Sequence, residues 1–324
     1  MRVADHTEAE WKRNMSEIMV QADNLVKIYK TKDVEVVALQ GLDLTVEKGE
    51  FMAIIGSSGS GKSTFLNMLG GLDRPSAGKL FVDGRNLFTM TEKELVDYKR
   101  ETVGFVWQNN GRNLIPYLTA YENIMMPMQL NGKKRRHNRE RAAMLLDLVG
   151  LSSKKNHRLS AMSGGEQQRI AIAIALANEP RVLLADEPTG SVDSQTAQYI
   201  YGVFQRLNRE LGQTIIVVTH DVSLSKHVQR VAAIRDGKIS SEKILKEDFE
   251  QRLKEAGQTV EWHYEEETQE EYAIVDRSGR VQLPREMLDQ LELSDNKVLV
   301  EYTESGILIR SPEASDRGAS DIIL

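Results

Sequence analysis

Apolar runs alternate with amphipathic, helix-like stretches from about residue 18 to residue 240. The runs Phe51–Ile55, Val182–Ala185 and Thr214–Thr219 consist almost wholly of apolar or β-branched residues, which is typical of strands buried in a parallel sheet. Strands that alternate with helical segments predict an α/β domain. Further strands are predicted at Val20–Ile28, at Leu42–Val46, at Lys79–Val82 before an Asp83–Gly84 turn, and at Val231–Ile239 with a turn at Asp236–Gly237.

The pattern changes in two parts of the chain. Residues from about 109 to 165 are mostly helical in pattern and are expected to form an inserted subdomain. Residues 241–270 are rich in Glu and Lys and predict a charged helical linker, since their apolar residues have helical spacing. From 271 to 312 a β pattern returns in a unit of about 40 residues, too small to bury a sufficient core alone, so we expect it to dimerise. Residues 1–17 and 313–324 are interpreted as tails.

Composition narrows the choice of protein class. The chain has 324 residues, of which 40% are hydrophobic, enough for one sizeable core and a small appendage. A net charge of −6 provides no general attraction to nucleic acid or anionic lipid. The chain contains no cysteine, which excludes disulfides and thiolate metal sites. Its most apolar run, Ile170–Ala177, is far shorter than the about 20 residues that span a bilayer, so a membrane process would need another chain.

A phosphate-binding loop is the strongest chemical signal. Residues Gly56–Ser63 fit the pattern G-x-x-x-x-G-K-[ST] between an apolar strand and a helical pattern over Thr64–Leu69. Glycines let the backbone wrap a phosphate at a helix N-terminus, where free N–H groups favour anions. Lys62 supplies charge at the β- and γ-phosphates, and the Ser63 hydroxyl can bind Mg²⁺. The predicted nucleotide contacts are Ser57, Ser58, Gly59, Ser60, Gly61, Lys62, Ser63 and Thr64.

Two adjacent carboxylates end a predicted strand. The apolar run Val182–Ala185 is followed by Asp186 and Glu187. A carboxylate at this place in a phosphate-loop ATPase lies beside the magnesium ion, which predicts Asp186 as a metal ligand. Glu187 is then placed to accept a proton from an attacking water.

One further element narrows the family. Met162–Arg169 reads Met-Ser-Gly-Gly-Glu-Gln-Gln-Arg and resembles the LSGGQ element of the ABC transporter family. The resemblance implies a P-loop, RecA-like ATPase with an inserted helical subdomain and an antiparallel β subdomain, which binds ATP and Mg²⁺. It also implies that this element meets the γ-phosphate held by a second copy, so the working form is a nucleotide-sandwiched homodimer. The residues it assigns to that contact are Ser163, Gly164, Gly165 and Glu166.

Other positions follow the family's order. Tyr29 lies before the phosphate loop, where the family stacks an aromatic ring on adenine. Gln108 resembles the glutamine that touches Mg²⁺ and the attacking water, and Asp193 resembles the aspartate of the D-loop. His220 resembles the switch histidine at the γ-phosphate. The resemblance therefore implies catalytic roles for Lys62, Gln108, Glu187 and His220, and metal binding by Ser63, Gln108 and Asp186.

Segments around this core indicate a branch of the family. Leu184–Gly190, Asn113–Pro116 and Leu118–Ala120 resemble the lipoprotein-release, macrolide-efflux and cell-division branch (LolD, MacB and FtsE). That resemblance implies an integral membrane permease of the FtsX or MacB type and a peripheral place at the cytoplasmic face of the membrane. The work done would be export, efflux, extraction of lipoprotein or lipid, or transmission of force. The run Asn109–Arg112 is longer than usual, so the resemblance does not identify the docking partner.

The C-terminal unit resembles a different family. Asp276–Pro284 is similar to the swapped-hairpin domain of AbrB and MazE proteins, which dimerise and often bind DNA. DNA binding needs a basic face. Here three arginines are offset by three acids, which favours a dimerisation module that keeps two ATPases together. The alternative is a soluble ABC ATPase with a DNA-binding regulatory C-terminal domain. The residues compared are Arg277, Arg280 and Arg285 against Asp276, Glu286 and Asp289.

Overall fold

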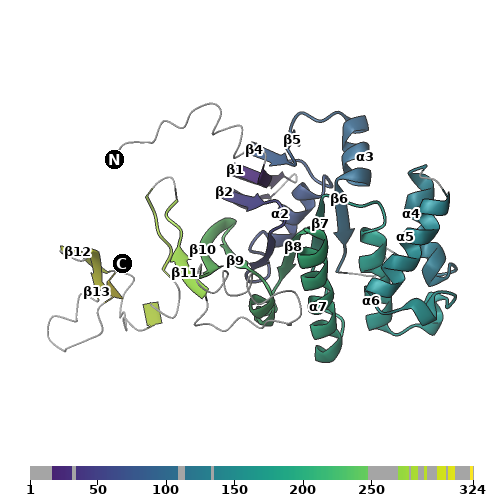
Figure 1. The fold of residues 1–324 in the computed structure, drawn as a ribbon. Helices are drawn as coiled ribbons and strands as arrows, with labels where there is room; N and C mark the ends of the chain where they lie inside the picture. The colour runs from purple at the N-terminus through teal and green to yellow at the C-terminus, as the bar shows by residue number, and fades with distance from the viewer. Residues whose placement is uncertain are drawn as a thin grey trace.

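A seven-stranded sheet and a separate four-stranded sheet form the main body of the protein (Figure 1). The structure is a computed structural model and describes residues 17–30, 34–108, 114–132, 135–246, 269–276, 279–283, 288–289, 298–303, 306–310 and 322–323. The large sheet has the order β11-β10-β9-β3-β8-β7-β6.

Five parallel strands form the centre of the large sheet. Successive residues point to opposite faces: Ile215 and Val217 join one buried cluster, whereas Ile216 and Val218 join the other. Both faces are therefore covered, which explains the unbroken apolar runs. The carboxyl ends of these strands meet at one edge of the sheet. The strands are β3 (Phe51–Ile55), β6 (Val103–Val106), β7 (Val182–Asp186), β8 (Thr214–Thr219) and β9 (Arg230–Arg235).

One face of this sheet is covered by helix α2 (Lys62–Leu69) and by the antiparallel sheet, which share one apolar cluster. The antiparallel sheet has the order β2-β1-β4-β5, and the turn at Asp83–Gly84 joins β4 to β5 as predicted. Helix α3 (Glu92–Glu101) buries Tyr98 in the same cluster. The four strands are β1 (Ile18–Lys30), β2 (Glu35–Glu47), β4 (Ala77–Val82) and β5 (Arg85–Asn86).

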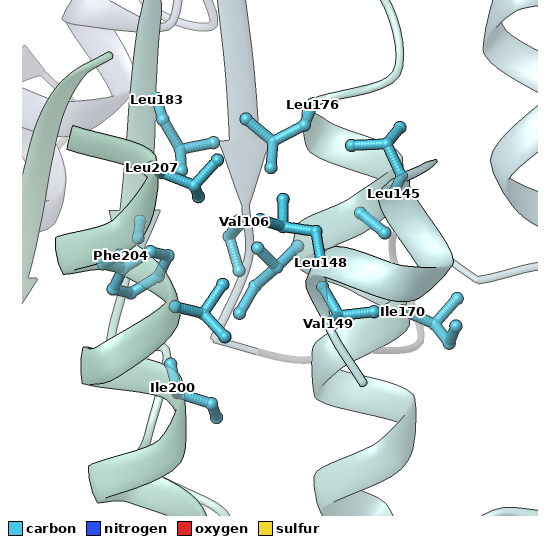
Figure 2. Packing of buried hydrophobic residues seen from close by; sticks show 14 of the residues in the cluster. Val106, Leu145, Leu148, Val149, Ile170, Leu176, Leu183, Ile200, Phe204 and Leu207 are labelled. Carbon is cyan, nitrogen blue, oxygen red and sulfur yellow. The ribbon is translucent and has the colours of Figure 1, made fainter. Parts of the chain in front are cut away.

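The opposite face is covered by helices. Figure 2 shows Ile200, Phe204 and Leu207 on one helix facing side chains such as Val106 and Leu148 across a continuous apolar layer. Helices α6 (Gly164–Ala175) and α7 (Ser194–Leu211) contact the strands, and α4 (Ala120–Leu130) and α5 (Arg135–Leu148) pack against α6 to extend the same apolar layer. Short 3₁₀ turns are η2 (Ser152–Lys154), η3 (Leu159–Ala161) and η4 (Val222–His227).

The expected helical linker begins differently in the structure. Residues 241–245 continue strand β10 (Lys238–Leu245), and β11 (Gln269–Ala273) pairs with it as the edge strand of the ATPase sheet. The helical prediction is therefore wrong over 241–245, because ladder hydrogen bonds to β9 and β11 override the apolar spacing. The predicted boundary at residue 271 also falls inside β11. The rest of the linker prediction, from 247 to 268, lies outside the described residues.

A small β structure follows. β12 (Leu299–Thr303), β13 (Gly306–Arg310) and β14 (Ile322–Ile323) form a three-stranded sheet, so the tail predicted for 313–324 contains one short strand. Its apolar cluster consists of Leu283 and Ile309 with Leu288 packed against them. Residues 1–16 of the first predicted tail lie outside the described residues, as do Asn109–Asn113. Within the described part of the chain, no helix has the length and apolar content that crossing a bilayer requires.

Candidate active site

The loop after β3 has a backbone that only glycine permits. A Cβ on Gly56 would lie 2.4 Å from the Ile234 carbonyl oxygen, and one on Gly61 would lie 2.7 Å from the Ala38 carbonyl oxygen. Gly61 also has φ +107°, in the region that side chains rarely adopt. The loop then enters α2, whose first N–H groups have no partner within the helix. This arrangement is a phosphate cradle at a helix N-terminus.

Lys62 is folded into this cradle. Its Nζ donates to the carbonyl oxygens of Gly56, at 2.7 Å, and Ser57, at 2.9 Å. The side chain is buried, and the nearby Ser60 Oγ is buried without a hydrogen-bond partner among the described residues. A buried ammonium group and an unsatisfied hydroxyl in a glycine-lined loop fit an anionic ligand such as a triphosphate. Ser57, Ser58 and Gly59 form the exposed rim of the same loop.

The hydroxyl of Ser63 meets the carboxylate of Asp186. Ser63 Oγ donates to Asp186 Oδ1 at 3.1 Å, which joins the first turn of α2 to the end of β7. These two oxygen ligands fit a hard cation such as Mg²⁺. Among the described residues, no group of three or more His, Asp or Glu side chains is arranged to hold a metal ion. A cation here would therefore need phosphate oxygens to complete its coordination.

Glu187 is held by the strand next to its own. Its Oε2 accepts from Thr219 Oγ1 at 2.9 Å, and its Oε1 accepts from the His220 N–H at 3.1 Å and lies 2.8 Å from His220 Nδ1. Glu187 has φ +46°, a strained conformation for a residue with a side chain, and its N–H donates to Val218. Strain that surrounding contacts maintain is typical of functional sites.

His220 and Gln108 flank this carboxylate on the same edge of the sheet. His220 follows β8 and its side chain is 72% exposed, so it can reach a ligand without displacing other groups. Gln108 lies two residues beyond β6 and is exposed. The order β3-β8-β7-β6 thus brings together the phosphate loop, His220, the two acids and Gln108, which are distant in the sequence.

Tyr29 lies near the end of β1, at the margin of the site. Its hydroxyl donates to Asp73 Oδ2 at 2.7 Å, and Lys27 Nζ lies 4.7 Å from the centre of its ring. Burial and then the Asp73 carboxylate raise the pKa of the Tyr29 hydroxyl. Tyr29 is 39% exposed and its ring is anchored at the hydroxyl end, so its exposed part is available to stack on a base. Thr64 is half-buried on α2 nearby.

The Ser-Gly-Gly-Glu segment begins helix α6. Ser163 Oγ accepts from the Glu166 N–H, and Glu166 Oε2 accepts from the Ser163 N–H, so the two residues form a capping box. The hydrogen bond from the Ser163 backbone lowers the pKa of the Glu166 carboxyl, which also pairs with Lys154 at 3.1 Å. The structure thus shows a capping role for Glu166, whereas the sequence suggested only nucleotide contact. Space beside Gly164 is open.

Asp193 caps helix α7. Its carboxylate accepts from the Thr196 N–H at 2.9 Å and from Thr196 Oγ1 at 2.7 Å, and these hydrogen bonds lower its pKa. Thr196 also packs closely on Gly165, where a Cβ would lie 2.6 Å from the Thr196 methyl group. Helix α6 lies in the cluster on one face of the sheet, and α2 lies in the cluster on the other. The Ser-Gly-Gly segment and the phosphate loop therefore begin helices on opposite faces.

A cavity of about 840 Å³ borders the start of the phosphate loop. Gly56, Ser57 and His220 line it together with Val281 and Leu283 of the C-terminal unit. The Lys238–Asp276 ion pair, 2.9 Å long, and a hydrogen bond from Ile274 to Ser240 fasten the start of that unit to β10. The C-terminal unit thus lies next to the candidate active site.

Sequence patterns did not reveal the groups that position the acids. Thr219 binds Glu187, and its place directly before His220 is the one signal that could have identified it. Tyr201 is also connected to this region, through Thr189 and Asp221, but Tyr201 matches no motif. Side chains that act through another residue are found only when the fold places them in contact.

Comparisons with known proteins agree with this geometry. The model of the ABC transporter family matches residues 39–190. The lipoprotein-releasing system ATP-binding protein LolD 1 of Chlorobium chlorochromatii is 49% identical over 209 residues, covering 64% of this chain and 84% of that protein. LolD of Syntrophus aciditrophicus is 45% identical over 221 residues, covering 68% of this chain and 98% of that protein.

Two further similarities concern a fused protein and a solved structure. The macrolide export ATP-binding/permease protein MacB of Syntrophobacter fumaroxidans is 43% identical over 69% of this chain, which corresponds to 31% of that longer protein. The dimeric structure of an ATP-binding cassette bound to ADP and Pi, in a post-hydrolysis state, superposes with a TM-score of 0.65 at 39% identity. That match covers 70% of this chain and 99% of the other.

Proposed function

Because this chain belongs to the ABC transporter family and is an ATP-binding, ATP-hydrolysing subunit of the LolD and MacB branch, we propose that two copies work as a nucleotide-sandwiched dimer. Each copy would bind ATP at its phosphate loop and complete the site of the other with Ser163, Gly164 and Gly165. The proposal is supported by the opposite placement of α2 and α6 in one chain and by the similarity to a dimeric cassette.

The observation that carries the catalytic proposal is the group of contacts at the carboxyl edge of the sheet. Glu187, held by Thr219 and His220, accepts the proton of the attacking water. Lys62 leaves the Gly56 and Ser57 carbonyls and stabilises negative charge on the β- and γ-phosphates. His220 and Gln108 orient the γ-phosphate and the water. Tyr29 stacks on adenine, and the rest of the loop, Ser57 to Thr64, binds the phosphates.

Mg²⁺ is the proposed resident cation. Ser63 and Asp186 would hold it, with Gln108 as a further contact, and when bound it neutralises charge on the phosphate oxygens. Asp193 would act at the dimer interface through the N-terminus of α7, and Glu166 would keep α6 capped while Ser163 approaches the partner's nucleotide.

The proposed partner is an integral membrane permease of the FtsX or MacB type on a separate chain. The support is the MacB relative, whose name combines ATP-binding and permease functions in one longer protein. The ATPase would then lie at the cytoplasmic face of the membrane, and ATP would drive dimer closure because it binds the closed state preferentially. The work would be export, extraction of lipoprotein or lipid, or transmission of force.

Replacement of Glu187 tests the catalytic proposal. Glu187→Gln keeps the shape and removes the base, so ATP binding is retained while hydrolysis falls by about 100-fold or more. Steady-state phosphate release and nucleotide binding by fluorescence measure the two quantities. Glu210→Gln, an exposed acid paired with Arg206 at the end of α7, is the matched control and keeps normal turnover. Normal turnover in Glu187→Gln would show that this assignment is wrong.

A mixing experiment tests the shared site. Lys62→Ala disables the phosphate loop, and Ser163→Asp keeps the helix cap but places a negative charge against the partner's γ-phosphate. Each variant alone is inactive. In an equal mixture half of the dimers are mixed, and each has one intact site, so about a quarter of the wild-type rate returns. No recovery in the mixture would contradict a site built from two copies.

The C-terminal unit is proposed as an AbrB- or MazE-like dimerisation module. Its support is a small cluster around Leu283 and Ile309 beside exposed Val298, Leu299 and Val300, which a second copy would cover. A chain that ends after Asp276 keeps the complete ATPase sheet. We expect it to hydrolyse ATP at high protein concentration but to sediment as a monomer without nucleotide. A nucleotide-free dimer of the same stability as the full chain would contradict the proposal.

A further inference from the structure

Helix α7 connects the two segments that carry Glu187 and His220. Tyr201, in the middle of this helix, is fully buried, and its hydroxyl donates to Asp221 Oδ2 at 2.6 Å. The same hydroxyl lies 2.9 Å from Thr189 Oγ1. Since the Tyr201 proton is directed to Asp221, Thr189 is the donor of the second bond. Thr189 follows Glu187 by two residues, and Asp221 follows His220 directly.

These bonds close into a ring that contains the candidate catalytic base. The Asp221 N–H donates to Thr219 Oγ1 at 3.0 Å, and Thr219 Oγ1 donates to Glu187 Oε2 at 2.9 Å. The chain itself completes the ring, because Thr189 lies in the turn from Glu187 to Gly190. The Gly190 N–H closes this turn by donating to the Glu187 carbonyl oxygen at 3.1 Å. The hydroxyls of Tyr201 and Thr219 each donate one hydrogen bond and accept another, so removal of either breaks the sequence of bonds.

The ring is packed as well as hydrogen-bonded. The Tyr201 ring lies 5.1 Å from the ring of His227, at the end of η4, and Gln205 Nε2 of the same helix donates to the His227 carbonyl oxygen at 3.1 Å. Asp221 also caps η4 through the Ser223 N–H. The segment after β8 is thus attached to α7 at Asp221 and again at His227, which restricts the movement of His220 relative to Glu187.

We propose that Tyr201 is a positioning residue for ATP hydrolysis, whose hydroxyl locks the Glu187 and His220 segments to α7. The inference rests on the proposed role of Glu187. The first turn of the same helix contacts Gly165 through Thr196, so α7 joins a copy's own hydrolysis site to the segment it presents to its partner's nucleotide. A rigid helix with both attachments transmits closure at one nucleotide to the geometry of the other.

The test is Tyr201→Phe in the full-length chain. The variant keeps the ring and its packing and loses only the hydroxyl. We expect kcat for MgATP to fall about tenfold, a change of about 1.4 kcal/mol in the activation barrier, with KM within about twofold. Tyr98→Phe is the matched control, because Tyr98 is also fully buried and its hydroxyl also donates, to the Leu69 carbonyl oxygen on the other face of the sheet. It keeps the normal kcat.

Thr189 provides a second measurement. Thr189→Val keeps the shape and removes the donor, so kcat falls as in Tyr201→Phe, whereas Thr189→Ser restores it. The double variant Tyr201→Phe with Thr189→Val is no slower than either single variant, because both break the same ring. Equal kcat values for Tyr201→Phe and Tyr98→Phe would overturn the inference, as would a change confined to KM.

The Glu187→Gln measurement separates this inference from the proposed function. If Glu187→Gln hydrolyses ATP normally, the catalytic assignment itself fails. If Glu187→Gln is inactive while Tyr201→Phe keeps full kcat, only the positioning role fails.

Discussion

The ATPase body and the C-terminal unit differ in how completely they bury their apolar residues. In the body, two large clusters cover both faces of the seven-stranded sheet, and side chains such as Phe51 and Leu66 are inaccessible to solvent. In the C-terminal unit the described cluster consists of Leu283 and Ile309 with Leu288 beside them, while Val300 on β12 is 57% exposed. The body has the core of an independent domain, whereas the described part of the unit leaves several apolar side chains exposed.

The difference shows how the two parts acquire their stability. In the body, parallel strands from distant parts of the sequence pair with one another, and helices on both faces bury their apolar side chains within one chain. The C-terminal unit gains order by adding β11 to the edge of the ATPase sheet and, as proposed, by pairing with a second copy. Pairing of β11 with the ATPase sheet places the unit next to the candidate active site. The proposed pairing with a second copy would make its stability depend on another molecule. Four predictions test this contrast.

Substitution of one glycine in each region gives the largest expected difference in stability. A Cβ on Gly104 of β6 would lie 2.3 Å from the Ala175 carbonyl oxygen and would push α6 away from the sheet. Gly104→Ala should therefore destabilise the body by about 3 kcal/mol. A Cβ on Gly279 has no heavy atom within 4 Å, so Gly279→Ala costs only the strain of φ +75°, about 1 kcal/mol. Urea unfolding of both variants measures the difference, and equal losses would contradict the contrast in packing.

Lys62→Ala separates the two proposed modes of association. Without the ammonium group, ATP hydrolysis should fall at least about 100-fold, and closure by nucleotide is lost. The nucleotide-free dimer should persist, because the C-terminal unit does not use Lys62. Sedimentation with and without MgATP measures both effects. Loss of the nucleotide-free dimer in Lys62→Ala would place the main dimer contact in the body instead.

Val300→Lys examines the surface of the C-terminal unit. A charge at an exposed apolar position that a partner covers should weaken nucleotide-free association about tenfold. The melting of the ATPase body should not change. Val96→Lys, at a similarly exposed valine on α3, is the matched control and leaves both properties unchanged. An identical dissociation constant for the two variants would show that Val300 is not at an interface.

The smallest expected effect is a change in the stability of the ATPase body with pH. Hydrogen bonds from Thr91 lower the pKa of Glu94, and hydrogen bonds from Thr119 lower the pKa of Glu122, in the capping boxes of α3 and α4. A depressed folded-state pKa stabilises the protein above the ordinary value near 4.5, and this contribution disappears as pH falls through the folded value. Urea midpoints should therefore show a smaller loss from about pH 5 to about pH 3 in Thr91→Ala and Thr119→Ala than in the wild type. Equal losses of the urea midpoint in the wild type and in both variants would contradict this prediction.

Motif and periodicity predicted most of the strands of the ATPase body, and the motifs placed the proposed site residues at the ends of those strands. The phosphate loop, Asp186 and Glu187 were predicted from motifs that end or follow apolar strands, and His220 was predicted from the resemblance to the ABC transporter family. The parallel sheet brings these residues to one edge. The prediction of a helix from residue 241 was wrong over 241–245 because Ile244 and Leu245 fit both a helical and a strand periodicity. Pairing with the neighbouring strand β9 decides between the two. The capping role of Glu166 was missed because the capping-box pattern and the nucleotide motif share the same residues.

Short sequence patterns were enough to predict the fold class, the phosphate loop and the family, because each of these patterns consists of residues close together in the sequence. The ring through Tyr201, Asp221, Thr219 and Glu187 arises differently. Its members come from the end of β8, the segments that directly follow β7 and β8, and α7, and nothing in their spacing requires them to meet. Packing of α7 against the sheet brings them within hydrogen-bond distance, since contacts between distant segments are set by the buried layer that holds those segments together.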